Sequence, residues 1–324
     1  MRISRITAPL PGLALSTVNL YLINGKVLVD AGQYSIQTLH VLIRSLNKHG
    51  TKLSDIEMLV LTHFHADHAT LTPVLKDLNG NMIIYMGEHD LDLIKRGAEK
   101  FVNDVLEIYT RNGVPMEEIK SITENHPVMR LAEIYRKDLA ELDIKPLRNG
   151  DAIRFGSDIL EVINCAGHTP GSICLYNNET KEIIVGDAIL QNITPSVIYH
   201  KYSSDPLEDH LNTMRRVISL DPVIAYPGHR DEIRYPRRRA EEIIDFHMRR
   251  LDEITSYLRD KDQTAYELAK KIRWRVKYET WDQFPFVERF FAIGETLAHL
   301  KYLERRRIVE SYEKNNVIYW TMAK

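Results

Sequence analysis

The sequence has few cysteines and no long hydrophobic run. Only two of the 324 residues are cysteine, Cys165 and Cys174. Two are too few for a disulfide scaffold, and their spacing matches no structural zinc ribbon. No apolar stretch approaches the roughly 20 residues that a helix needs to cross a bilayer, and the first residues contain no signal-peptide core. We therefore expect a cytoplasmic protein in which any metal site is built from histidine and carboxylate side chains, and 13 histidines are available.

Neither sign of charge is in large excess, since the net charge is only −2. With 44% hydrophobic and 27% charged residues, the composition is that of a folded globular protein. Residues 236–324 carry a net charge of +4 and residues 1–235 a net charge of −6. This change of sign, together with a change of pattern, predicts two domains, 1–235 and 236–324. A surplus of four positive charges is a weak indication of nucleic-acid binding.

Residues 1–235 alternate short apolar runs with amphipathic segments, which predicts an α/β fold in which helices cover two sheets. Within this region of the sequence, residues 88–142 are expected to form a helical insert that is broken at 113–115. The insert is longer than a connection requires, so it is either a lid over a cleft or part of the core. The expected strands are 18–23, 27–29, 56–61, 82–85, 152–155, 159–163, 172–176, 183–185 and 223–226, and the expected helices are 36–46, 69–78 and 206–218.

Residues 236–324 have a different pattern. Amphipathic spacing predicts helices at 240–258, 265–272 and 286–306, with Thr264 as a cap of the second helix. Alternating residues at 308–312 and 317–321 then predict a hairpin. Three helices followed by a hairpin is the outline of a winged-helix domain.

Histidine and aspartate side chains gather directly after a predicted buried strand. His63, His65, Asp67 and His68 lie within six residues, between the strand at 56–61 and the next helix. Residues i and i+2 of an extended segment point the same way, so His63 and His65 can hold one ion. The turn into the helix then directs Asp67 and His68 toward a second position. Imidazole and carboxylate groups are suitable ligands for zinc and similar divalent metals.

The motif His63-x-His65-x-Asp67-His68 resembles the signature of the metallo-β-lactamase superfamily. The rest of that family's series follows in order, with His168 in Gly167-His168-Thr169, Asp187 after Gly186, and His229 in Pro227-Gly228-His229. The likeness extends over about residues 1–235 and implies an αββα sandwich.

The resemblance also implies a dinuclear metal centre. One ion would be held by His63, His65 and His168, and the other by Asp67, His68 and His229, while Asp187 would bridge the two. A shared carboxylate and a shared hydroxide offset the repulsion between two dications about 3.5–4 Å apart. Zinc is the expected metal, with Mn²⁺ and Fe²⁺ as alternatives, and Asp67 and Asp187 are the expected catalytic carboxylates. The metals would lower the pKa of bound water and supply the nucleophile.

Differences between this sequence and several branches of the family limit the substrate classes that we expect. A bridging Asp187 is unlike true β-lactamases, and His65 replaces the carboxylate of flavodiiron proteins. Ser172 stands where glyoxalase II-type sequences often have a second histidine, and the long insertion of β-CASP nucleases is missing. The sequence resembles most the hydrolases that carry a C-terminal winged-helix-like domain. Some of these act on thioesters or lactones, and one branch cleaves single-stranded RNA.

The expected function is therefore hydrolysis of a small ester-like substrate, such as a thioester or lactone, through a metal-bridging hydroxide. A metal-dependent nuclease acting on single-stranded RNA or another phosphodiester is the alternative. A third class, a nucleic-acid-binding regulator, is disfavoured because all seven ligand positions are filled. No membrane partner is expected, and the C-terminal region is a candidate surface for a homodimer.

Several residues have two interpretations from the sequence alone. Asp30 either hydrogen-bonds a ligand histidine or is a turn residue. Tyr199, His200 and Tyr202 either assist catalysis from a loop or simply pack. Cys165 is expected to be a small buried apolar residue. The arginine runs at 237–239 and 305–307 are expected to be solvated helix faces.

Overall fold

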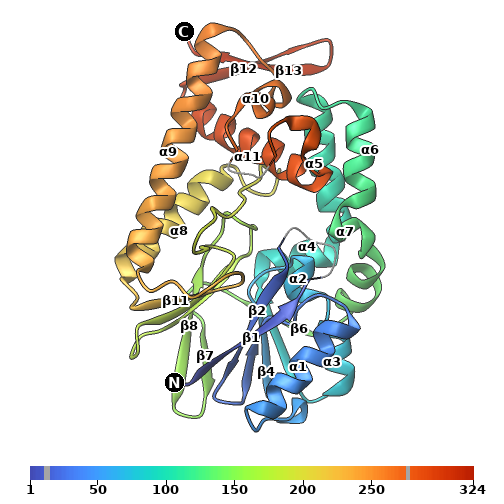
Figure 1. The fold of residues 1–324 in the computed structure, drawn as a ribbon, viewed down its shortest axis with the longest axis vertical. Coiled ribbons are helices and arrows are strands. Elements are labelled where there is room, and N and C mark those ends of the chain that lie inside the picture. Colours follow the sequence, from blue (N-terminus) through green and yellow to red (C-terminus); the bar gives the residue numbers. More distant parts are fainter. Residues whose placement is uncertain (11–14, 275–277) are drawn as a thin grey trace.

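Two β-sheets pack face to face in the computed structural model of the chain, which describes residues 1–10, 15–274 and 278–324 (Figure 1). The first sheet has the order β1-β2-β3-β4-β5-β6 and the second the order β11-β10-β9-β8-β7. The strands of the first sheet are β1 (Ile3–Pro9), β2 (Thr17–Ile23), β3 (Val27–Val29), β4 (Met58–Leu61), β5 (Ile83–Gly87) and β6 (Ile144–Leu147). Those of the second sheet are β7 (Ala152–Phe155), β8 (Asp158–Asn164), β9 (Ile173–Asn177), β10 (Glu182–Gly186) and β11 (Ile224–Pro227).

An apolar layer fills the space between the sheets. Val29 and Val60 of the first sheet share one buried cluster with Leu160 and Leu175 of the second. Strands β2 and β3 are buried almost throughout, which explains why they read as continuous apolar runs. The predicted turn between them is confirmed, since Asn24 and Gly25 have φ values of 49° and 70°, as a tight hairpin turn requires.

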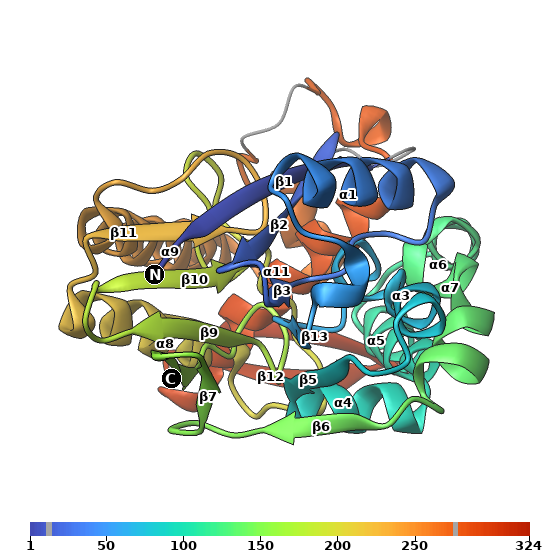
Figure 2. The same cartoon turned by 90° about the horizontal axis from the view of Figure 1, so that it is seen from below.

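Helices cover the outer faces of both sheets, so the predicted αββα sandwich is confirmed. Figure 2 shows α1 and α3 beside the first sheet and α8 beside the second. The side chain of Ser35 caps α1 by accepting a hydrogen bond from the amide of Thr38. These helices are α1 (Ile36–Lys48), α2 (Ala66–Ala69), α3 (Thr72–Leu78), α8 (Pro206–Leu220) and α9 (Pro236–Asp260).

The helical insert consists of several short helices. In addition to the predicted break at 113–115, the chain turns at Gly97, whose φ is 97°. Phe101 and Val105 are buried in the same core cluster as the outer face of the first sheet. The elements of the insert are α4 (Glu88–Arg96), α5 (Ala98–Arg111), α6 (Met116–Asn125), α7 (Pro127–Arg130) and a π-helical turn (Ile134–Leu139).

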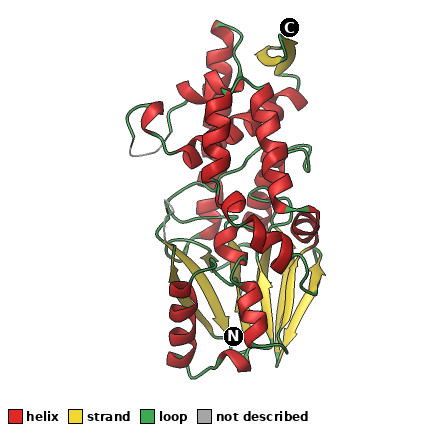
Figure 3. Cartoon of the chain, turned by 90° about the vertical axis from the view of Figure 1, so that its right-hand side faces the viewer, coloured by secondary structure: helices red, strands yellow, loops and turns green. Residues whose placement is uncertain are grey.

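The C-terminal region contains the predicted helices and hairpin. They are α9, α10 (Ala265–Lys271), α11 (Phe286–Arg305), β12 (Val309–Lys314) and β13 (Val317–Met322). Phe290 and Trp320 of this region lie in the same buried cluster as Tyr109 of the insert. Figure 1 shows α11 and the hairpin at the end of the molecule away from the N-terminus, beside α5 and α6. In Figure 3 the C-terminus likewise lies at the opposite end of the molecule from the two sheets. Among the described helices, none combines the length and the apolar character that a membrane span needs.

Three expectations needed correction. Strands β1 and β6 were not predicted, because β1 mixes polar and apolar residues and β6 has only four residues, including Pro146. The helix expected at 69–78 is two helices, α2 and α3, and the first begins at Ala66. Cys165 is buried as expected, but it forms a disulfide with Cys174. The ladder explains this pairing, because the amide of Cys165 bonds the carbonyl of Ser172 between β8 and β9.

Candidate dinuclear metal centre

All seven predicted ligands lie beyond the carboxyl ends of strands. Strand β10 runs parallel to β11 and antiparallel to β9, which is itself antiparallel to β8, so β8, β10 and β11 end at one edge of the second sheet. The remaining predicted ligands follow strand β4 of the first sheet. The resulting order is His63, His65, Asp67 and His68 after β4, His168 after β8, Asp187 after β10, and His229 after β11.

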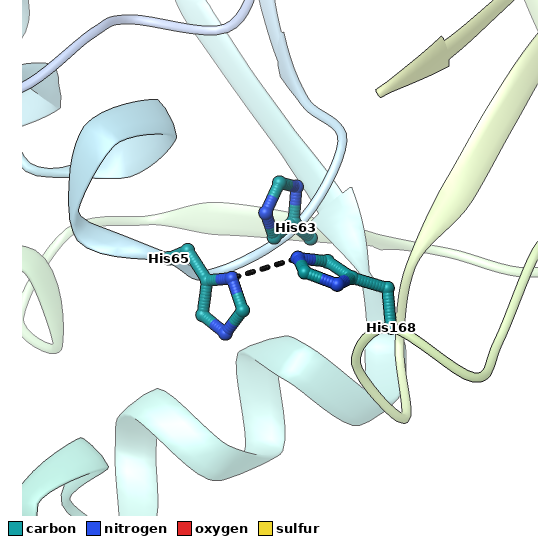
Figure 4. A group of neighbouring side chains, drawn as sticks. All are labelled: His63, His65 and His168. Atoms are coloured by element: carbon teal, nitrogen blue, oxygen red, sulfur yellow. Dashed lines mark hydrogen bonds between the residues drawn. The ribbon is translucent and has the colours of Figure 1, made fainter. Parts of the chain in front are cut away.

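His63, His65 and His168 form the first group, and their rings point toward one another in Figure 4. The Nδ1 atom of His65 lies 3.0 Å from the Nε2 atom of His168, which comes from the opposite sheet. His63 is 1% exposed and His168 9%. This group is the predicted first ligand set.

Asp67, His68 and His229 form the second group. The Nε2 atom of His229 lies 3.2 Å from the Oδ2 atom of Asp67. Asp187 stands between the groups, since one of its carboxylate oxygens is 3.3 Å from Nε2 of His229 and 3.7 Å from Nε2 of His168. Its other oxygen is 3.6 Å from Nε2 of His68. The carboxylate that was predicted to bridge is thus placed to reach both groups.

The unpaired atoms of the cluster fit a pair of metal ions. Within the described part of the chain, the Nε2 atoms of His63, His68 and His229 and Oδ1 of Asp187 are buried without a hydrogen-bond partner. A buried polar atom left unsatisfied costs about 1–3 kcal/mol. Imidazole nitrogens and a carboxylate oxygen are the donor set that zinc and related ions bind. The cluster therefore has the chemistry of a metal site.

The ring nitrogens that face away from the cluster are each held by an acceptor. Nδ1 of His168 donates to the carbonyl oxygen of Ser196 (2.9 Å), and Nδ1 of His229 donates to that of Thr17 (2.7 Å). A carbonyl oxygen only accepts, so Nδ1 carries a proton and Nε2 is the ring nitrogen that faces the cluster. Such outer contacts fix the tautomer and orientation of metal-binding histidines.

Asp30 plays the same part for His68. Its Oδ2 atom accepts a hydrogen bond from Nδ1 of His68 at 2.7 Å and another from Oγ1 of Thr62 at 2.9 Å. Of the two interpretations of Asp30, the first gave it a hydrogen bond to a histidine predicted to bind metal, and that hydrogen bond is present. Asp30 is 1% exposed and has a φ of 62°, so it also forms the turn after β3.

The carboxylates make the site strongly attractive to cations. Burial lowers the pKa of His229, but Asp187 and Asp67 outweigh this effect and raise that pKa to about 11. For His68, Asp187 and Asp30 similarly outweigh burial and raise the pKa to about 9. His63 has no such excess of carboxylates, and burial lowers its pKa well below the usual range.

Sequence reasoning missed Asp90, which connects two ligand loops. Asp90 is fully buried at the start of the insert and accepts hydrogen bonds from the amides of Phe64 (2.9 Å) and Gly171 (2.7 Å) and from Oγ1 of Thr169 (2.7 Å). Burial raises its pKa to about 6, although these three bonds oppose the shift. The sequence carried no signal for this role, because Asp90 lies in an amphipathic helix next to Asp92, which is solvated.

Three residues of the loop after Asp187 were singled out in the sequence, and each contacts a neighbouring group. They are Tyr199, His200 and Tyr202. Nδ1 of His200 accepts hydrogen bonds from the amides of Tyr202 and Ser203, both at 3.2 Å, and burial lowers the pKa of His200 to about 3. The hydroxyl of Tyr202 donates to Asp104 of the insert at 2.5 Å. The ammonium group of Lys301 lies over the ring of Tyr199, 5.6 Å from its centroid.

Comparison with known proteins places this site in a family. The family model of the metallo-beta-lactamase superfamily matches residues 14–229. A probable metallo-hydrolase of Bacillus subtilis is 29% identical, over 98% of this chain and 97% of its own length. An atrochrysone carboxyl ACP thioesterase of Aspergillus fumigatus is 21% identical, over 77% of this chain and 62% of its own length.

A solved structure supports the same assignment. A metallo-beta-lactamase family protein of Thermus thermophilus superposes with a TM-score of 0.81 and is 27% identical, over 99% of this chain and 98% of its own. The similarity to this protein and to the Bacillus relative includes the region after residue 229. The chain belongs to the metallo-β-lactamase superfamily and is a metal-dependent hydrolase.

Proposed function

We propose that this protein hydrolyses a small ester-like substrate, such as a thioester or lactone, at a dinuclear metal centre. The observation that carries the proposal is the pair of ligand groups that both lie within reach of Asp187, with the Nε2 atoms of His63, His68 and His229 buried. Two divalent ions bound there, Zn²⁺ or alternatively Mn²⁺ or Fe²⁺, would lower the pKa of a water molecule and polarise the substrate's carbonyl group.

The two carboxylates have different roles in this proposal. Asp187 holds the two ligand groups at a fixed separation, because its carboxylate lies between them. Asp67 is the more exposed of the two carboxylates, at 17% against 8%, and we assign it the role of accepting a proton from the attacking water. Both cysteines are joined in a disulfide, so neither supplies a nucleophile. These assignments extend the two catalytic roles expected from the sequence.

The substrate class rests on two observations. One relative is named as a thioesterase, and a thioester belongs to the proposed class. The basic runs that would guide a nucleic acid are occupied by acidic partners: Arg238 pairs with Glu242, and Arg306 pairs with Asp205. We therefore favour a compact substrate over single-stranded RNA. Residues 236–324 are proposed as a winged-helix-like domain that covers the catalytic part and is a candidate dimer surface.

Metal loading combined with a substrate panel tests the function. Chelated protein is reloaded with zinc or manganese and assayed on thioesters, lactones, phosphodiesters and single-stranded RNA. We expect turnover of a thioester or lactone that depends on added metal. If two ions are bound and no ester is turned over, the proposal is wrong. Cleavage of RNA with steep salt dependence would instead establish the nuclease.

Removing the shared carboxylate tests the ligand assignment. Asp187→Ala should lower kcat/KM by about 100-fold or more and release at least one ion per chain, because it removes the group between the two ligand sets. Asp143→Ala is the matched control, since Asp143 is 79% exposed and pairs with Lys145 on the surface. A variant that keeps both ions and full activity would rule out Asp187 as a bridge.

A further inference from the structure

A second group of buried histidine and carboxylate side chains lies between α9 and α11, outside the centre described above. His247 comes from α9, and Glu295 and His299 come from α11. Both histidines are 0% exposed and Glu295 is 8% exposed. One potential ligand atom from each of these residues lies within 4.8 Å of the other two.

Helix geometry brings the three side chains together. Glu295 and His299 are four residues apart, so they share one face of α11. Helix α9 presents His247 to that face, and the Nδ1 atom of His247 lies 3.1 Å from Nε2 of His299. This spacing is close to the 3.0 Å between the ring nitrogens of His65 and His168 in the candidate metal centre.

The orientation of His299 is also that of a metal ligand. Its Nδ1 atom donates to the carbonyl oxygen of Glu295 at 2.7 Å, which leaves the lone pair on Nε2. His168 and His229 are held in the same way, by the carbonyl oxygens of Ser196 and Thr17.

Several polar atoms around this pair have no partner. Among the described residues, Nε2 of His247, Oε1 of Glu295 and both ring nitrogens of His210 are buried without a hydrogen bond. The ring of His210 lies against that of His247, with 5.4 Å between centroids. Imidazole nitrogens and a carboxylate oxygen that gather in this way are the donor set that a zinc-type ion binds.

Glu295 shares its positive neighbour with a second carboxylate. Arg250 is the neighbouring positive group, with Nη1 3.7 Å from Oε1 of Glu295. Its Nε atom is, however, 3.3 Å from Glu253, and its guanidinium group lies over Trp274, 4.2 Å from the ring centroid. Glu253 thus balances the charge of Arg250, and Glu295 remains as a buried carboxylate that gains from a second positive partner.

We propose that His247, Glu295 and His299 bind one divalent transition-metal ion of the zinc type, separate from the dinuclear centre. The ion joins α9 to α11 and thereby fastens the C-terminal helices to each other. Because the donor atoms come from two helices, binding contributes to the stability of their packing. The proposal does not depend on which substrate the enzyme hydrolyses.

Metal analysis of the full-length protein tests this proposal. Zinc-loaded wild type, freed of loosely bound metal by gel filtration, should contain three ions per chain. His299→Gln should contain two and keep both ions of the dinuclear centre, whereas Asp187→Ala should keep the ion at α9 and α11. The control is His126→Asn, a buried histidine outside both groups, which should retain three ions. Two ions in wild type, with no change in His299→Gln, would overturn the proposal.

A second pair of measurements covers the case in which His299→Gln does not fold. Glu295→Gln keeps the shape of the side chain but loses its charge, and it should weaken the binding of the third zinc ion about tenfold or more in competition with a chelator. Cobalt-loaded wild type should show a third absorbing ion, and Glu295→Gln should need more cobalt to reach the same absorbance. Unchanged chelator competition and identical cobalt spectra would show that the group is a hydrogen-bonded network without metal.

Discussion

Asp90 shows how one buried carboxylate can hold two ligand loops in place. It accepts a hydrogen bond from the amide of Phe64, which lies between two of the predicted ligand histidines. It accepts another from the hydroxyl of Thr169, which follows a third predicted ligand histidine. The amide of Gly171 completes the set. A carboxylate is well suited to this place because it only accepts hydrogen bonds and has sites for several of them.

Asp90→Ala should lower the free energy of unfolding by about 3 kcal/mol, since it leaves two amides and a hydroxyl buried without an acceptor. Metal content should fall as well, because the loops that carry His65 and His168 lose their connection. Urea unfolding and metal analysis measure the two effects. Asp92→Ala is the control on the same helix, where the carboxylate is 62% exposed. A loss below about 1 kcal/mol for Asp90→Ala would show that the three donors find other acceptors.

His126 should make the stability depend on pH. It is buried against Phe290, with ring centroids 4.7 Å apart, and burial lowers its pKa to about 4. The unfolded chain binds this proton below about pH 6.5, whereas the folded protein stays neutral down to about pH 4. Stability from this residue is therefore present above pH 6.5 and is lost as the pH falls.

His126→Asn should remove that dependence. Asparagine can still accept the hydrogen bond that Nδ1 of His126 receives from the amide of Val128 at the start of α7. Between pH 7.5 and pH 5.5, wild type should lose about 1.3 kcal/mol more than the variant, as measured by urea unfolding at both pH values. Parallel curves for the two proteins would mean that His126 protonates equally in the folded and unfolded states.

The elements that the sequence predicted are those with a strong local signal. The apolar runs on either side of Asn24-Gly25 predicted one hairpin. Apolar spacing with the cap Thr264 predicted α10, which has a capping box with Glu267. Strand β6 gave no such signal, since it contains Pro146 and lies at the edge of its sheet, where its place depends on pairing with β5. The break at Gly97 was missed because a single glycine inside a helical pattern is ambiguous.

Gly294 controls how closely α11 approaches its neighbours. A Cβ atom at this position would lie 2.3 Å from Oη of Tyr109 in α5 and 2.7 Å from Cβ of Ile198 in the loop after Asp187. The carbonyl oxygen of Gly294 also accepts a hydrogen bond from the amide of Tyr199. The insert, this loop and α11 therefore meet at one residue without a side chain.

Gly294→Ala should lower the free energy of unfolding by about 2 kcal/mol, although alanine favours helix by about 1 kcal/mol, because α5 or the loop must move to admit the methyl group. The control is Gly80→Ala, where an added Cβ would meet no atom within 4 Å and stability should stay within about 0.5 kcal/mol. Chemical unfolding compares the two. Equal stability of both variants would mean that the contact relaxes without cost.

Across the molecule, the sequence predicted the grouping of the seven histidine and aspartate side chains better than the other long-range contacts. These residues occur in an ordered series at the ends of strands, so the resemblance pointed to them without knowledge of the packing. The group around His247 and Glu295 could not be predicted in this way, since it depends on how two helices rotate against each other. The Cys165–Cys174 disulfide likewise depends on the register of β8 and β9.

The position of the dinuclear centre predicts that metal removal weakens the whole fold. Its ligands come from both sheets: His63 and His68 follow β4, whereas His168, Asp187 and His229 follow strands of the second sheet. Ions bound only by the folded state stabilise it by about 4 kcal/mol at a thousand times the dissociation constant. Chelation should therefore lower Tm, and added zinc should restore it. His299→Gln separates this effect from the third ion, because it should retain the dinuclear centre and still lose stability on chelation. If chelation empties the centre in that variant without changing Tm, then the two sheets hold together without the metals.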